Sequence, residues 1–186
     1  MPADIASPMT EGVNARLFLS FSSRRLEQLS HRVISCLFQL SDEQVWARGG
    51  QNENSAANLV LHLCSNVTQW IVAGIGGEND SRQRDEEFAA RGGLNGKQLS
   101  GKLSSTVLRA MMIIDTVSSQ RLIERVFIQK REVSVLEAIY HVVEHFSMHT
   151  GQIIFITKRL TGRSLNLGHD SLPITKDARG EHGPTS

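Results

Sequence analysis

The sequence predicts an all-α fold, an antiparallel four-helix bundle with long connections. Four stretches repeat apolar residues at the 3.6-residue period of an amphipathic helix, and the segments between them are rich in Gly, Asn and charged residues. Of 186 residues, 40% are hydrophobic and 21% are charged, which is usual for a globular domain with its own core. We therefore expect one bundle domain over residues 11–162, between an N-terminal tail at 1–10 and a C-terminal tail at 163–186.

The first helix is expected over residues 13–38, and its apolar, core-facing positions include Leu17, Phe21, Leu29, Val33 and Leu37. Directly after it, Ser41 and Gln44 have the spacing of a capping box, in which each side chain bonds the other residue's backbone. This spacing predicts a short helical turn. The stretch ARGGQNEN that follows has the glycines and asparagines of a loop.

The second and third helices are expected over residues 55–75 and 97–118. Between them, residues 78–96 are charged and rich in glycine, and RQRDEEF within them is expected to form a loop or one turn facing solvent. Residues 121–132 alternate between apolar and polar side chains, which predicts an extended connection or a short strand pair. Ser134 then opens the last helix with a second capping box, and this helix is expected to end near Gly162.

The last helix carries three histidines four residues apart, His141, His145 and His149. Residues at this spacing stack on one face of a helix. His145 and His149 fall within the apolar arc that should face the core, and His141 lies at its edge. Burying neutral imidazoles among aliphatic side chains is costly unless their ring nitrogens find partners. A metal ion is one such partner, and a polar group of another helix is the other.

A metal site built on His145 and His149 needs a third ligand, for which His62 in the middle of the second helix is the candidate. Three imidazoles leave a coordination position open, as in catalytic rather than structural sites. The alternative is that His62 bonds a carbonyl or water while the other two satisfy one another. An all-imidazole ligand set favours Zn²⁺ or Ni²⁺. The chain has neither the Glu-x-x-His pairs of di-iron bundles nor the zinc-protease motif.

Three more polar residues lie near the proposed ligands by helical geometry, and each is a candidate to contact a ligand nitrogen: His141, Asn66 and Gln152. The alternative for each is an exposed, solvated side chain. Cys36 and Cys64 form no CxxC motif and are expected to be reduced, buried thiols of a cytoplasmic protein. A net charge of +1 argues against nucleic-acid binding, and neither a membrane span nor a secretory signal is expected.

His62 within NLVLHLCSNVTQWI, together with HVVEHFSMHTGQI downstream, resembles the DinB-like superfamily, and SAANLVLHL points to one bacterial branch of it. The resemblance runs over most of Arg16 to Gly162 and includes the turn LSDEQVW. It implies a four-helix bundle, often a homodimer, with a metal held by three histidines at the positions of His62, His145 and His149. Relatives include transferases that use bacillithiol and isomerases that use mycothiol.

The resemblance and the histidine pattern together lead us to expect a metal-dependent enzyme with Zn²⁺ or Ni²⁺ as its ion. It would transfer a low-molecular-weight thiol to a small electrophile or hydrolyse that electrophile, with the metal generating the nucleophile at neutral pH. The alternatives are a non-catalytic bundle that binds metal and a dimeric, stress-related interaction protein.

Overall fold

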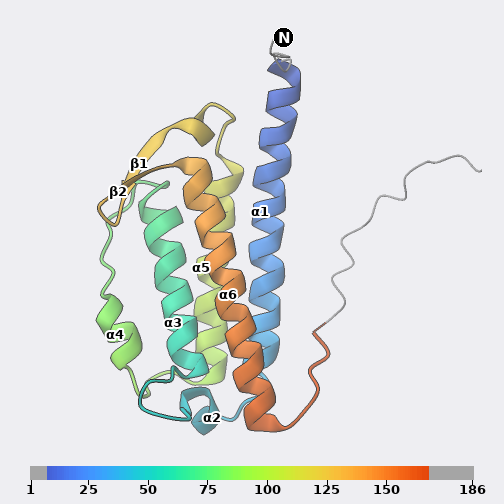
Figure 1. Ribbon diagram of the computed structural model, residues 1–186, viewed down its shortest axis with the longest axis vertical. Helices are drawn as coiled ribbons and strands as arrows, with labels where there is room; N and C mark the ends of the chain where they lie inside the picture. Colours follow the sequence, from blue (N-terminus) through green and yellow to red (C-terminus); the bar gives the residue numbers. More distant parts are fainter. Residues whose placement is uncertain (1–7, 168–186) are drawn as a thin grey trace, which may run out of the picture.

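The computed structural model describes residues 8–167, with side chains from Gly12 onward. Long helices α1 (Pro8–Leu37), α3 (Ala56–Val67), α5 (Gly96–Asp115) and α6 (Val135–Thr161) lie side by side in a bundle (Figure 1). The all-α bundle is thus confirmed. Much of the predicted tails, 1–10 and 163–186, lies outside the described residues, although Leu165 and Leu167 still contact the core.

The direction of the helices shows one feature that the sequence did not indicate. Helix α3 runs antiparallel to α6, whereas α3 and α5 run in the same direction (Figure 1). Two parallel neighbours require a connection that returns along the bundle. Residues 78–95 form this crossover and include the short helix α4 (Arg84–Ala89), which packs against α3. The crossover therefore covers the outer side of α3.

Helix α1 begins at Pro8, earlier than expected, and its buried face includes the predicted Leu29, Val33 and Leu37 together with Leu19 and Leu26. Leu17 and Phe21 are 59% and 45% exposed, so the prediction that they face the core is wrong. Each is two residues from Leu19, which corresponds to about 200° around a helix, and they therefore point away from the buried face. The predicted turn at Ser41 is α2 (Asp42–Trp46), with its capping box in place.

The predicted second helix consists of two segments in direct succession. Helix α3 starts after a buried N-cap, Ser55, which forms a capping box with Asn58. After Val67 the chain continues as a π-helix, η1 (Thr68–Ala73), a widened turn that proteins often place at functional sites.

The predicted strand pair is confirmed, following the short 3₁₀ helix η2 (Arg121–Ile123). Strands β1 (Arg125–Ile128) and β2 (Arg131–Ser134) pair antiparallel, with Ile128 opposite Arg131. The two turn residues between them both have positive φ, as in a tight two-residue hairpin. Ser134 then caps α6 through a capping box, and Gly162 ends this helix in the left-handed conformation, as the sequence predicted.

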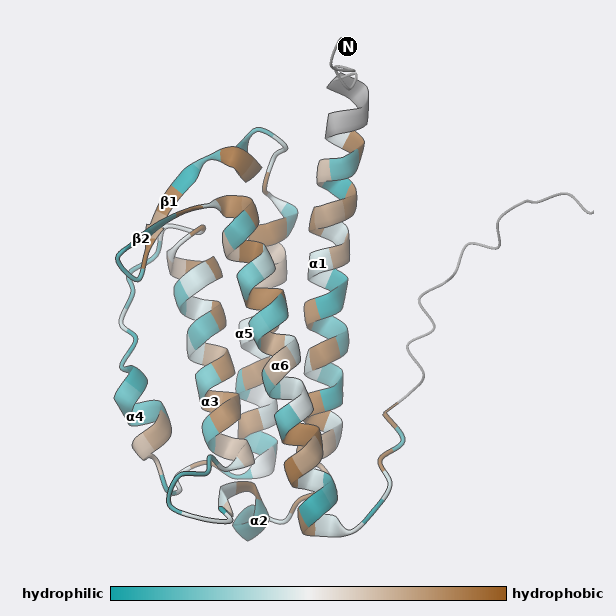
Figure 2. Cartoon of the chain, viewed as in Figure 1, coloured by the Kyte–Doolittle hydropathy of each residue, from teal (hydrophilic) through white to brown (hydrophobic). Residues whose placement is uncertain are grey.

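The core fills the space between the four long helices, and each of them contributes buried apolar residues to it. Figure 2 shows hydrophobic and hydrophilic residues alternating along each of these helices. Among the fully buried side chains are Leu26, Leu63, Leu103, Phe146 and Ile153. No helix in residues 8–167 combines the length and the apolarity needed to cross a bilayer. The core fixes α3 against α6, and this pair of helices carries the histidines.

Candidate metal centre

Three imidazoles from two helices meet at one point between α3 and α6. Nε2 of His145 lies 3.1 Å from Nε2 of His62 and 3.2 Å from Nε2 of His149. One ring nitrogen from each residue falls within 4.8 Å of the other two. His62 and His149 are buried, and His145 is half-buried. The structure therefore brings together the three residues that the sequence proposed as ligands.

The ring of His62 is held from behind by the crossover. Its Nδ1 lies 2.8 Å from Oε2 of Glu87, the buried carboxylate of α4. Arg82 donates to both oxygens of the same carboxylate, from Nε at 2.8 Å and from Nη2 at 3.0 Å. Burial alone would raise the pKa of Glu87, but the hydrogen bonds from His62 and Arg82 outweigh it and lower the pKa below the ordinary value. Glu87 is therefore an ionised acceptor. Nη2 of Arg82, which can only donate, also lies 3.0 Å from Nδ1 of His62. Because the ionised Oε2 of Glu87 is closer, at 2.8 Å, we assign the His62 proton to Nδ1.

The ring of His149 is oriented in the same way by its own helix. Its Nδ1 lies 2.7 Å from Oε1 of Gln152, one turn further along α6, and an amide oxygen can only accept. The proton of His149 therefore sits on Nδ1. In His62 and His149 alike, Nε2 is left as a lone pair aimed at His145.

Without a cation, the three rings have too few protons to give each Nε2–Nε2 contact a hydrogen-bond donor. Nε2 of His145 carries at most one proton and can donate to only one of the two lone pairs it faces. Burial, followed by the nearby His149 and His62, lowers the pKa of His145 to about 3, so its ring is neutral at physiological pH. In at least one of the two Nε2–Nε2 contacts, two lone pairs therefore face each other at hydrogen-bond distance. A single cation bound by all three nitrogens removes this conflict.

The spacing of the nitrogens also fits such an ion. Zn–N bonds of about 2.05 Å at tetrahedral angles put ligand nitrogens about 3.3 Å apart. The two contacts of His145 measure 3.1 and 3.2 Å. Imidazole suits Zn²⁺ and Ni²⁺, and a carboxylate behind a histidine ligand is a common support in metal sites. The residues present can therefore hold a divalent ion of this kind.

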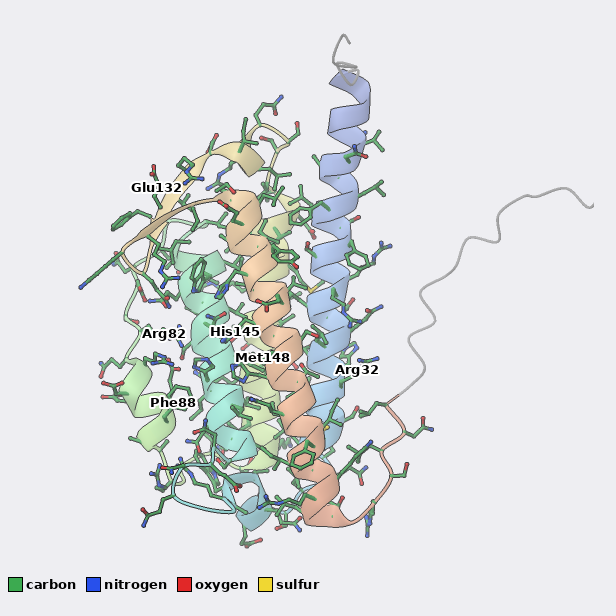
Figure 3. The ribbon with its side chains drawn as sticks, in the orientation of Figure 1. Arg32, Arg82, Phe88, Glu132, His145 and Met148 are labelled. Atoms are coloured by element: carbon green, nitrogen blue, oxygen red, sulfur yellow. The ribbon has the colours of Figure 1, made fainter. Side chains whose placement is uncertain are left out.

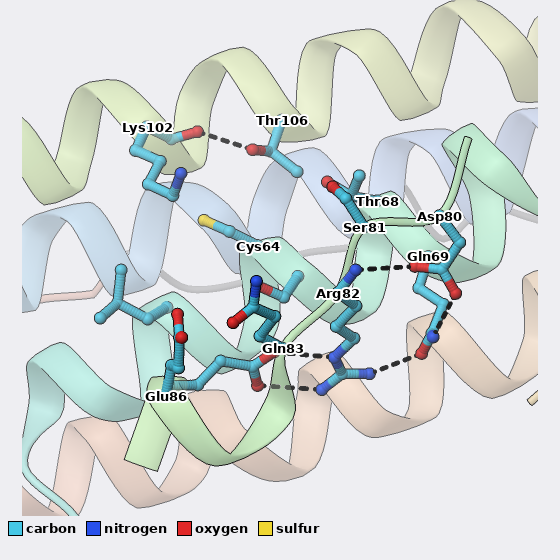
Figure 4. A pocket seen from close by; sticks show the side chains of 13 residues that line it. Cys64, Thr68, Gln69, Asp80, Ser81, Arg82, Gln83, Glu86, Lys102 and Thr106 are labelled. Atoms are coloured by element: carbon cyan, nitrogen blue, oxygen red, sulfur yellow. Dashed lines mark hydrogen bonds and ion pairs between the residues drawn. The ribbon is translucent and has the colours of Figure 1, made fainter. Parts of the chain in front are cut away.

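Arg82 links the cluster to a wider set of hydrogen bonds. Its Nη1 donates to Oε1 of Gln69 in the π-helix at 2.9 Å, and the amide of Gln69 donates to Asp80 at 2.6 Å (Figure 4). The same arginine lines a pocket of about 440 Å³ between α3, α5 and the crossover, and Cys64 and Lys102 also line this pocket. Burial raises the pKa of the Cys64 thiol to about 11, so it is no nucleophile at neutral pH. Both cysteines are free and buried, as expected.

The other residues proposed from the sequence are placed differently. Gln152 contacts a ligand nitrogen, as described. His141 is half-buried and stacks on Trp70, with ring centroids 4.2 Å apart, while its centroid lies 5.5 Å from that of His145. Asn66 is buried, and its Oδ1 has no hydrogen-bond partner in residues 8–167. Neither His141 nor Asn66 makes a hydrogen bond to the three central rings in the described part of the chain.

The segment RQRDEEF holds the functional residues that sequence reasoning missed. It was expected to face solvent, and residues 83–86 are exposed. The side chains of Arg82 and Glu87, however, are only 5% and 6% exposed, so the expectation is wrong for these two residues. Phe88 places its ring 4.7 Å from that of His62, and Figure 3 shows Arg82 and Phe88 on the α4 side of His145. One side of the segment is buried because α4 packs against α3. No periodic signal in a six-residue helix reveals which side is covered.

Comparison with known structures supports the fold. A conserved protein from Enterococcus faecalis has 16% identity and a TM-score of 0.66, covering 77% of this chain and 97% of that one. A DinB-like protein from Bacillus cereus has 14% identity and a TM-score of 0.62, covering 80% and 93%. A DinB-like protein from Bacillus subtilis has 15% identity and a TM-score of 0.57, covering 76% and 93%. At these identities the likeness concerns the fold.

The sequence itself gives the family. No curated protein matches it. The model of the family described as "Protein of unknown function (DUF1572)" matches residues 14–176, which is most of the chain. This match and the DinB-like neighbours confirm the resemblance stated from the sequence. The chain is therefore a member of the DUF1572 family, with the helical fold of DinB-like proteins.

Proposed function

We propose that this protein is a metal-dependent enzyme acting on a small electrophile, with a divalent ion, Zn²⁺ or Ni²⁺, held by His62, His145 and His149. The observation that carries the proposal is the convergence of three Nε2 atoms whose lone pairs outnumber the available protons. When bound, such an ion lowers the pKa of a thiol or water and so supplies a nucleophile at neutral pH.

The chain's own residues prepare this site in three ways. Glu87 and Gln152 hold the Nδ1 protons of two rings and thereby fix which nitrogens face the centre. Arg82 balances the charge of Glu87, so the carboxylate stays ionised without drawing the ion away from the imidazoles. Phe88 lies against His62 and shields this side of the site from water.

The reaction we propose is transfer of a low-molecular-weight thiol to the electrophile, or hydrolysis of that electrophile by water. Zn²⁺ and Ni²⁺ suit either chemistry because neither needs to change its redox state. The second candidate function is binding of the ion without turnover. The buried contact between Glu87 and His62 strengthens metal binding in an enzyme and in a non-catalytic binder alike, so it favours both candidates equally.

We also propose that the protein works as a homodimer in the cytoplasm. Exposed apolar side chains on α1 and α6, such as Leu17, Phe21 and Tyr140, offer surface for a second copy. Free Cys36 and Cys64 are in keeping with a reducing compartment. Analytical ultracentrifugation tests the dimer, and a monomer at micromolar concentration would contradict it.

The direct test is metal analysis of protein purified without an affinity tag. We expect about one Zn or Ni per chain, lost in a His145→Ala, His149→Ala double variant. His141→Ala is the matched control, since this histidine lies on the same helix outside the cluster, and it should keep the metal. Absence of metal from the wild type, or its retention in the double variant, would overturn the proposal.

Turnover separates the enzyme from the non-catalytic binder. The metal-loaded protein is assayed with a model electrophile and each of bacillithiol, mycothiol, glutathione and cysteine, and then with water alone. Turnover that disappears in the double variant but not in His141→Ala supports the enzyme. Stoichiometric metal without turnover of any combination supports the binder.

A further inference from the structure

A groove of about 490 Å³ runs between α3 and α6, on the C-terminal side of His149. Its walls are mostly apolar and come from Leu59, Met148, Phe155 and Ile156. Ligand sites in proteins are typically concave, mostly apolar and about 300–1,000 Å³ in volume. The groove therefore has the size and the lining of a site for a small organic molecule.

The groove begins where the histidine cluster ends. Gln152, whose amide oxygen bonds Nδ1 of His149, is itself part of the groove's lining. Leu59 precedes His62 by one helical turn on α3, and Met148 lies next to His149 on α6, where Figure 3 shows it beside His145. A molecule lying in the groove thus has one end within reach of the cluster.

The charges around the groove offset each other. Arg159 and Glu53 pair at its far rim, 3.4 Å apart and about half-exposed. The remaining lining is neutral, and Gln152 offers only an amide. A ligand with a net charge would find no unpaired opposite charge here, whereas an apolar body loses little by leaving water.

We propose that this groove is the substrate subsite of the metal centre and that it takes an electrophile with a neutral aryl or alkyl body. The inference rests on the proposed function, which it extends to a substrate class. Gly151 determines the specificity, because it leaves open the space that a side chain would fill. Gly151 lines the groove, and a Cβ at this position would meet nothing within 4 Å, so a larger side chain has room there without disturbing the helix.

The test compares two glycines in equivalent settings. Gly151→Leu places a side chain in the groove, while Gly101→Leu is the control, since Gly101 is also an exposed helix residue with nothing within 4 Å of its Cβ. Both variants should unfold at or above the wild-type temperature, because leucine favours a helix more than glycine does. The probe is N-phenyl-1-naphthylamine, a neutral aromatic dye that fluoresces in apolar sites.

We expect the Gly151→Leu variant to bind this dye at least tenfold more weakly than the wild type, and Gly101→Leu to bind it within twofold. Equal affinity in both glycine variants, or no binding to the wild type, overturns the subsite. Metal content is measured separately on the same samples. A wild type without metal overturns the proposed function, while metal-loaded variants that differ as expected support both.

The dye's position relative to the cluster is measured with Co²⁺ as a paramagnetic ion. The NMR signals of the bound dye should broaden in the Co²⁺-loaded wild type compared with the Zn²⁺-loaded protein. Broadening places the groove's ligand beside the histidines, and its absence overturns the link between the groove and the metal centre.

Discussion

Replacing Glu87 by Gln tests whether the crossover supports the histidine cluster. The substitution keeps the shape of the side chain and removes its charge. In the wild type the carboxylate accepts from Nδ1 of His62 at 2.8 Å and from Nε and Nη2 of Arg82 at 2.8 and 3.0 Å. A glutamine oxygen can still accept from His62, but its NH₂ group faces the guanidinium as a donor against a donor. The cationic Arg82 then stays buried without its charged partner, although Nη1 still donates to Gln69.

The size of the effect follows from these three contacts. A hydrogen bond to a charged group contributes about 1.5–3 kcal/mol and a neutral one about 0.5–1.5 kcal/mol, so each contact loses about 1 kcal/mol. The sum, about 3 kcal/mol, agrees with the roughly 3–5 kcal/mol lost when a buried ion pair is broken. For a domain of this length, 1 kcal/mol shifts Tm by about 2–4 °C. We therefore expect a decrease in Tm of about 6–12 °C for the metal-free protein.

The assay is thermal unfolding followed by circular dichroism in the presence of a chelator. Glu86→Gln is the matched control, because Glu86 is the exposed neighbour on α4 and its loss should change stability by less than about 0.5 kcal/mol. Chelator competition should show metal binding about 10–100-fold weaker in Glu87→Gln and unchanged in Glu86→Gln. Equal behaviour of the two variants would refute the reasoning.

The pH dependence gives a second test of the same substitution. The folded-state pKa of Glu87 lies below its ordinary value of 4.5. Its ionised form therefore stabilises the fold fully above that value, and this contribution is lost as the pH falls through the folded pKa. The stability difference between wild type and Glu87→Gln should shrink in acid below about pH 4.5. A constant difference down to unfolding would contradict this assignment.

Three further substitutions test the site and its surroundings. Burial lowers the pKa of His145 to about 3, so at His145 the unfolded chain binds a proton below about pH 6.5 while the folded chain does not. The free energy of unfolding of the wild type should therefore fall between about pH 7 and about pH 5. In His145→Gln this decrease should be smaller, as measured by urea titrations with chelator. Asn58→Ala should cost about 3 kcal/mol in the same titrations, whereas Asn95→Ala, which removes an exposed cap, should cost only about 1 kcal/mol. Ser55→Ala, which removes the buried cap of α3, should fall between them, at about 2 kcal/mol.

Most of the fold was predictable because its signals are local. The capping boxes at Ser41 and Ser134, the alternation before Ser134 and the glycine at 162 each depend on neighbours within a few residues, and the structure has all of them. The histidines were predictable for a related reason. A spacing of four places His145 and His149 on one face of a helix, whatever the helix packs against.

The residues behind the cluster were not predictable because they depend on tertiary contact alone. Glu87 lies 25 residues from His62 in the chain, and nothing in its immediate sequence distinguishes it from Glu86. The two differ because α4 turns one carboxylate inward and the other outward. That orientation is set by the path of the crossover, and local periodicity carries no information about it.

The parallel direction of α3 and α5 explains why a charged segment lies directly behind the histidine cluster. An antiparallel connection would have needed only a short turn beyond η1, whereas the observed topology takes residues 78–95 back along α3 (Figure 1). Asn58 holds this segment against α3 through hydrogen bonds, since its amide donates to the carbonyl oxygens of Glu87 at 2.8 Å and Ala90 at 3.0 Å. Asn58 and His62 lie one turn apart on α3, so the residue that fixes α4 also sets how closely Glu87 approaches the imidazole. It follows that Asn58→Ala should weaken metal binding although Asn58 touches no ligand, and chelator competition should show this loss in Asn58→Ala and not in Asn95→Ala. Equal metal affinity in these two variants would mean that Glu87 holds its position without the crossover's anchor.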